Sequence, residues 1–156
     1  MNAPLASTEA AAVWRGRRVL FALVAVLSLA GAIVSAISLQ RHYAKSATEF
    51  CDFSQQFSCD IVNRSEYSSI VGIPVAGIGV AGYAALFVLA TFRKSRVETR
   101  NQLLGAAVVG LAFALYLTYI EAYVLMTWCI LCLISLLLIS LISVLAVIIR
   151  AKSATA

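Results

Sequence analysis

The chain of 156 residues is 62% hydrophobic and only 12% charged, and its mean hydropathy is +0.95. Soluble domains carry about a quarter charged residues, and disordered chains have low hydrophobicity, so both classes are excluded. The net charge of +5 arises from 12 Lys and Arg against 7 Asp and Glu, and the positions of these residues decide its meaning.

Four apolar segments without Lys or Arg are each long enough to cross a bilayer core of about 30 Å as a helix. They cover residues 19–39, 70–92, 103–123 and 128–149. Because they use most of the chain, the sequence predicts an all-α membrane protein with four transmembrane helices and terminal tails at 1–18 and 150–156. A retained first helix is favoured over a cleaved signal peptide, since no A-x-A site closes its long apolar run.

The loops between these segments differ in length. Residues 40–69 form the only long hydrophilic loop, and residues 93–102 form a short connector. The link at 124–127 is so tight that the third and fourth helices are expected to be antiparallel neighbours. Pro74, preceded by Gly72, is typical of a helix start, where the missing N–H costs nothing.

Positive charge gathers on one side of the predicted bundle. With four spans, nine basic residues share the side of both termini, and only three lie on the side of loop 40–69. The nine are Arg15, Arg17, Arg18, Arg93, Lys94, Arg96, Arg100, Arg150 and Lys152. The positive-inside rule therefore predicts cytoplasmic termini and an outer loop at 40–69. Contact with anionic lipid accounts for the remaining positive charge, without a nucleic-acid partner.

All four cysteines fall at or beyond the outer ends of the predicted helices. Cys51 and Cys59 form a C-x7-C pattern in the outer loop, and Cys129 and Cys132 form a C-x-x-C at the start of the fourth helix. Disulfides persist outside the cytoplasm, so this even set predicts two redox pairs. The alternatives are a structural staple, above all for Cys51–Cys59, buried thiols that act as small hydrophobic groups, and a zinc site. The zinc site is disfavoured because no His lies near the C-x-x-C.

The C-x-x-C is the stronger indication of redox chemistry. Cys129 and Cys132 share a helix face and can form a small disulfide ring. The positive end of the helix is expected to stabilise a thiolate and lower the pKa of these thiols. A stabilised reduced form makes the corresponding disulfide a better oxidant. Cys132 lies one turn deeper, where a molecule with an isoprenoid tail can reach it.

The combined pattern resembles the vitamin K epoxide reductase family. It consists of the C-x7-C in the first outer loop, Ser65 six residues after its second Cys, and the C-x-x-C that opens the last helix. The resemblance covers residues 19–149 and implies a four-helix bundle around a quinone, capped by the outer loop. It also implies that Cys132 faces the quinone with Cys129 as its partner. Cys51 and Cys59 would then be the loop shuttle, and Ser65 would support the site by a hydrogen bond.

The resemblance further implies a function. A thioredoxin-like or DsbA-like protein outside the cytoplasm would pass electrons to Cys51–Cys59, then to Cys129–Cys132, and finally to a quinone of the ubiquinone, menaquinone or vitamin K class. Such a protein lies in the bacterial inner membrane and supports disulfide formation outside the cytoplasm. Its thiol partner is expected to be a separate protein. Animal members carry a Tyr and an Asn that contact the quinone where Leu136 and approximately Val75 stand here. A plain quinone is therefore favoured over the epoxide.

Several alternatives remain open at this point. The DsbB-type disulfide oxidase performs the same chemistry with its two cysteine pairs in the reverse order, and a membrane scaffold with two structural disulfides would not be an enzyme. Glu121 either faces the quinone or reaches the outer interface, since intramembrane carboxylates usually face the bundle interior. Tyr119 and Trp128 either line the quinone pocket or anchor the helices at the interface. His42 is expected to be solvated in a loop.

Overall fold

The computed structural model describes residues 3–43, 52–54, 57–70, 72–92 and 97–154. Four long helices dominate it: α1 (Ala3–Tyr43), α3 (Val75–Phe92), α4 (Val97–Ile120) and α5 (Ile130–Ala154). Four helical stretches are long and apolar enough to cross a membrane, namely Arg15–Tyr43, Val75–Phe92, Glu98–Leu125 and Ile130–Lys152. The predicted architecture, a bundle of four transmembrane helices, is confirmed.

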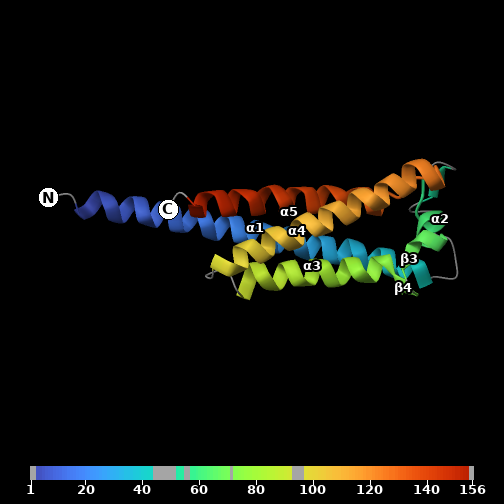
Figure 1. Cartoon of the computed structure of the whole chain (residues 1–156), viewed down its shortest axis with the longest axis horizontal. Coiled ribbons are helices and arrows are strands. Elements are labelled where there is room, and N and C mark those ends of the chain that lie inside the picture. The colour runs from blue at the N-terminus through green and yellow to red at the C-terminus, as the bar shows by residue number, and fades with distance from the viewer. Residues whose placement is uncertain (1–2, 44–51, 55–56, 71, 93–96, 155–156) are drawn as a thin grey trace.

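The four long helices pack side by side, with α1 against α3 and α5, and α4 against α5. The beginning of α1 and the end of α5 lie at one end of the bundle, whereas α2 and the short strands lie at the other (Figure 1). Helices α4 and α5 run antiparallel, as the tight link between them predicts. The short helix α2 and the short strands therefore lie together at one end of the bundle.

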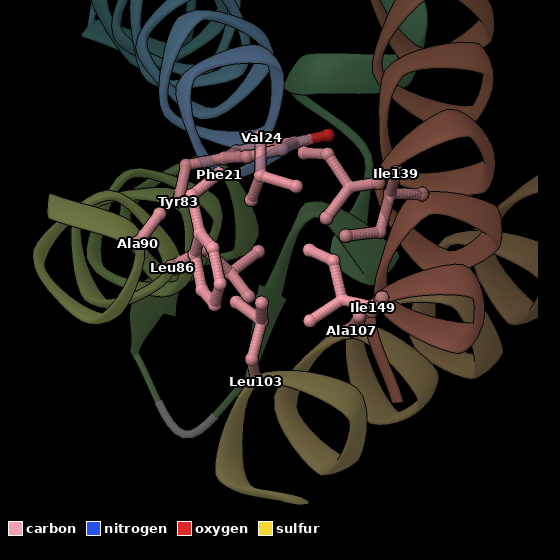
Figure 2. Close-up of a cluster of buried hydrophobic side chains, with 11 residues drawn as sticks. Phe21, Val24, Tyr83, Leu86, Ala90, Leu103, Ala107, Ile139 and Ile149 are labelled. Atoms are coloured by element: carbon pink, nitrogen blue, oxygen red, sulfur yellow. The ribbon is translucent and has the colours of Figure 1, made fainter. Parts of the chain in front are cut away.

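A compact apolar core joins all four helices. Buried positions on α1 recur every three or four residues, which is the spacing of one helix face. Figure 2 shows side chains of this core pointing toward one another from the four helices, among them Phe21, Val24, Tyr83, Leu86, Leu103 and Ile139. Many large apolar side chains on the outer faces are exposed, as expected of helices that face lipid tails.

Short elements cover one end of the bundle. Strand β1 (Asp52–Ser54) pairs antiparallel with β2 (Phe57–Ser58), and α2 (Cys59–Asn63) follows directly. The Ser58 hydroxyl caps α2 by accepting the Ile61 N–H at 3.3 Å. A 3-10 turn, η1 (Glu66–Ser68), then leads into β3 (Ser69–Ile70), which pairs with β4 (Ile73–Pro74). Gly72 adopts a φ of 79° between β3 and β4, a conformation that favours glycine.

Helix boundaries differ from those predicted. Helix α1 begins at Ala3, so the predicted tail at 1–18 is largely helical, and its several alanines are strong helix formers. Helix α3 begins at Val75, directly after Pro74, because the residues before it pair as β3 and β4. The third span continues past Ile120 into a π-helical turn, η2 (Glu121–Leu125), which the sequence did not predict.

Candidate active site

Three cysteines meet where α2 lies over the N-terminal start of α5. Cys59, the first residue of α2, and Cys129 are both fully buried, and Cys132 packs against the same cluster. The Cys129 thiol interacts with the thiols of Cys59 and Cys132 within this cluster. Cys59 and Cys129 are 70 residues apart in sequence, so the fold brings a thiol of the loop against the C-x-x-C. Cys51 lies outside the described residues.

The C-x-x-C occupies the N-terminus of α5, as predicted. The Cys129 carbonyl accepts the Leu133 N–H at 3.0 Å, which places Cys129 just before the first turn and Cys132 within it. Hydrogen bonding with Cys132 has the largest effect on Cys129 and raises its pKa; burial also raises it, while the hydrogen bond with Cys59 lowers it. The prediction of a lowered pKa is therefore wrong for Cys129, because the neighbouring thiol and burial outweigh the helix dipole.

The turn between α4 and α5 brings Glu121 to the C-x-x-C. After the π-helical turn, Met126 adopts a left-handed conformation with φ 49°, and the Thr127 N–H donates to the Glu121 carbonyl at 3.2 Å. The chain then folds back, so that the Cys129 N–H donates to Glu121 Oε2 at 3.1 Å. π-Helical turns of this kind frequently occur at functional sites. Of the two positions predicted for Glu121, the structure has the interior one, with the side chain only 2% exposed.

A cavity of about 470 Å³ lies between the helices beneath α2. Cys132 and Glu121 contribute to its wall, together with polar groups from the end of α1 and the segment after Cys59. Apolar and small residues of α3, α4 and α5 form most of the remaining lining. The cavity therefore exposes the deeper cysteine of the C-x-x-C to an apolar space within the bundle.

A polar corner of the cavity centres on Asn63, which is only 7% exposed. Its Oδ1 accepts the Ser38 hydroxyl at 2.8 Å, whereas its Nδ2 has no hydrogen-bond partner among the described residues. Ser65, predicted to support the site, lines the cavity and donates its hydroxyl to the Val62 carbonyl at 2.8 Å, at the end of α2. Both N–H donors of the buried Asn63 amide are therefore unused within the described part of the chain.

His42 was expected to be solvated in a loop, and this expectation is wrong. The histidine is the penultimate residue of α1, is half-buried, lines the cavity and hydrogen-bonds through Nδ1 to the Asn63 carbonyl. Neither His42 nor Asn63 carried a sequence signal, because each stands alone in a hydrophilic stretch.

The two aromatic candidates lie apart from the cavity lining. Tyr119 is 57% exposed and its ring packs on Tyr123, with centroids 4.9 Å apart. Neither Tyr119 nor Trp128 contributes to the wall of the cavity. Their contact with a quinone stays a prediction. Within the described ranges, no three His, Cys, Asp or Glu side chains are grouped as ligands for a metal ion.

Thiols in contact across two elements can exchange a disulfide, and this exchange site opens onto an apolar cavity among membrane-spanning helices. Such an arrangement is that of a membrane-embedded thiol oxidoreductase. Comparison with known families agrees, since residues 22–147 match the vitamin K epoxide reductase family. The chain belongs to this family, and the resemblance inferred from its cysteine pattern is confirmed. Membership makes the protein an integral membrane oxidoreductase of a family that acts on thiols and quinones.

The cavity fits the quinone that this family uses. Pockets for small molecules usually measure about 300–1,000 Å³ and combine apolar walls with a few polar groups. This cavity has the required volume, and the unpartnered Asn63 Nδ2 is a donor suited to a carbonyl oxygen. Val75 of α3 is also part of the lining. The amide residue in this lining, Asn63, comes from α2.

Proposed function

We propose that the protein oxidises a separate thioredoxin-like protein outside the cytoplasm and passes the electrons to a quinone. The route runs through Cys51–Cys59 and then Cys129–Cys132, and it supports disulfide formation in client proteins. The contact between Cys59 and Cys129 carries this proposal, because it is the contact that an exchange between the two pairs requires.

The first pair accepts electrons from the partner. Asp52 and Ser58, the neighbours in sequence of Cys51 and Cys59, are register partners in the β1–β2 hairpin. Opposed residues of an antiparallel pair lie about 4.5–5.5 Å apart at Cα, and a disulfide needs a Cα separation of about 4.4–6.8 Å. This register supports a Cys51–Cys59 disulfide, which the thiol of a partner protein would attack.

The second step is an exchange within the protein. Once the first pair is reduced, Cys59 attacks Cys129 of the Cys129–Cys132 disulfide, which forms a Cys59–Cys129 bond and releases Cys132 as a thiolate. Cys51 then attacks Cys59, which restores the Cys51–Cys59 disulfide and frees Cys129. The electron pair now resides on the C-x-x-C, and burial of Cys59 and Cys129 restricts this exchange to the internal partner.

The last step takes place in the cavity. Oxidation of the C-x-x-C dithiol releases two electrons and two protons, and a quinone takes up both to become a quinol. Cys132 lines the cavity and would face the quinone ring, and the Asn63 amide, which belongs to the same lining, would bind a carbonyl oxygen. Ser65 holds the end of α2 over the cavity through its bond to the Val62 carbonyl. The protein thereby orients the reacting groups, and the quinone supplies the electron sink.

The orientation in the membrane follows from charge. The nine basic residues of the terminal side belong to the segments around the start of α1, the α3–α4 link and the end of α5. Helix α2, which begins with Cys59, lies at the other end of the bundle (Figure 1). We therefore orient the protein with cytoplasmic termini and with the cysteines on the outer side of a bacterial inner membrane.

The decisive experiment traps the internal exchange. In Cys51→Ser, Cys59 still attacks Cys129, but the serine hydroxyl is a far poorer nucleophile than a thiolate and does not resolve the bond. With a site for a sequence-specific protease placed between residues 93 and 97, the cleaved variant should migrate as one piece without reductant and as two with it. Wild type should separate under both conditions.

A matched control uses the double variant Cys51→Ser/Cys129→Ala, which should separate without reductant. Separation of the single variant would contradict the proposed order of transfer. Purified wild type should also oxidise a dithiol in the presence of a short-tailed quinone, and Cys132→Ser should abolish this activity. Cysteines that stay inert toward quinone would identify the protein as a scaffold instead of an enzyme.

A further inference from the structure

Glu121 is a buried carboxyl that lies against the C-x-x-C. Its Oε2 accepts the Cys129 N–H, but Oε1 makes no hydrogen bond of ordinary geometry with a described group. No ion pair with Lys or Arg is formed by this carboxyl in the described part of the chain. Burying a carboxyl without a charged partner is unfavourable, so its place in the fold calls for a functional explanation.

The carboxyl lies against the reacting sulfur. Glu121 and the Cys132 thiol interact directly, and both residues line the cavity. Among the residues that line the cavity, Glu121 is the one carboxylic acid, and the other titratable groups there are His42, Tyr67, Tyr83 and Cys132. A proton that leaves Cys132 therefore has a carboxyl oxygen as its adjacent acceptor.

We propose that Glu121 is the acid–base residue of dithiol oxidation, which takes the proton from the Cys132 thiol and delivers it to a quinone oxygen. This inference rests on the proposed function. Cys129 and Cys132 together lose two electrons and two protons as their Sγ–Sγ bond forms. The quinone gains both electrons, and its two oxygens gain the protons. Glu121 carries the two protons one after the other, and at the end of the turnover it has returned to its starting protonation state.

The bond from the Cys129 N–H gives Glu121 a fixed position for this task. It holds one carboxyl oxygen against the backbone of the C-x-x-C, and this keeps the side chain at the wall of the cavity. A general acid or base must lie within hydrogen-bond reach of the proton that it moves. The π-helical turn supplies this placement, because Glu121 is its first residue.

The test is single-turnover oxidation of pre-reduced protein by a short-tailed quinone in detergent. In Glu121→Gln the side-chain carbonyl can still accept the Cys129 N–H, but the amide cannot carry a proton. The oxidation rate should fall by about 100- to 10,000-fold, the usual range for general acid–base catalysis, with little change in the quinone concentration for half-maximal rate. Glu98→Gln, an exposed carboxyl in the first turn of α4, is the matched control and should keep the wild-type rate.

A second variant guards against a structural effect. Glu121→Ala should be equally slow, and added formate, a small acid that can enter the vacated space, should restore part of its rate in a concentration-dependent way. A Glu121→Gln protein that is oxidised within threefold of wild type, or a Glu121→Ala protein that formate does not rescue, would overturn the assignment of Glu121. Failure of the wild type to be oxidised by quinone would instead refute the proposed function.

Discussion

Gly31→Ala probes the packing that shapes one wall of the cavity. A Cβ added at Gly31 would lie 2.5 Å from two atoms of the Tyr83 ring, far inside van der Waals contact. The ring is 5% exposed and its hydroxyl donates to the Ser135 carbonyl at 2.9 Å. It therefore cannot withdraw without breaking this bond between α3 and α5. Because Tyr83 also lines the cavity, the clash acts on the site as well as on stability.

The expected magnitude follows from three contributions. Overpacking in a filled core costs about 1–3 kcal/mol, and a lost hydrogen bond costs about 0.5–1.5 kcal/mol. Replacement of glycine by alanine inside a helix returns roughly 1 kcal/mol. Gly31→Ala should therefore lower the free energy of unfolding by about 1–3 kcal/mol. Gly105→Ala in α4, where a Cβ meets nothing within 4 Å, should instead be neutral or stabilising by up to about 1 kcal/mol.

The assay is thermal unfolding in detergent. A thiol-reactive dye detects unfolding, because it reacts when the buried Cys129 becomes exposed. The variant Gly31→Ala should unfold at a lower temperature than wild type, and Gly105→Ala should not. Truncation of the ring as Tyr83→Ala should remove most of the added cost of Gly31→Ala, since the two sites are in contact and their effects are not additive. Equal stability of Gly31→Ala and Gly105→Ala would refute the close packing of α1 on α3.

Three further predictions concern orientation, reactivity and binding. A membrane-impermeant maleimide should label the reduced Cys51–Cys59 pair in intact spheroplasts but not a cysteine placed at residue 95, and the reverse pattern would invert the topology. The Cys132 hydrogen bond raises the pKa of Cys129, so the thiolate of Cys129 forms only at higher pH. Cys132→Ala should therefore move the pH midpoint for alkylation of Cys129 downward. An unchanged midpoint would contradict this cause of the raised pKa. Asn63→Leu should raise KM for the quinone by about 2- to 13-fold through loss of one hydrogen bond. Ser38→Ala, which leaves Asn63 Nδ2 in place, should raise KM less; an equal rise in both would assign the effect to packing of α2.

The sequence predicted the helices and the redox motif because each depends on local properties. Length and apolar content mark the four spans, and the tight link before Trp128 predicts antiparallel α4 and α5. The C-x-x-C at a helix start required only the position of two cysteines relative to one apolar segment. Extension of the first helix to Ala3 was missed, since hydropathy marks the part of a helix in the bilayer and not its continuation beyond the bilayer.

The arrangement of the site depended on contacts that local patterns do not contain. The meeting of Cys59 with Cys129 arises from the way α2 seats on the bundle, and only the family resemblance anticipated it. The place of Asn63 and His42 in the cavity depends on the same seating. The pKa of Cys129 depends on burial and on neighbouring thiols, so the helix dipole alone gave the wrong direction.

The position of Glu121 was ambiguous because a carboxyl near the end of a span can reach either the interface or the bundle interior. Two backbone N–H groups of the returning chain decide the question: Thr127 donates to the Glu121 carbonyl and Cys129 donates to its side chain. The same residue therefore closes the end of α4 and positions the start of α5. Since the C-x-x-C begins in this link, the geometry that ends one helix also places the carboxyl beside the sulfur that faces the cavity. A substitution in the link would consequently alter proton transfer and thiol exchange together, whereas one in the lipid-facing part of α5 would alter neither.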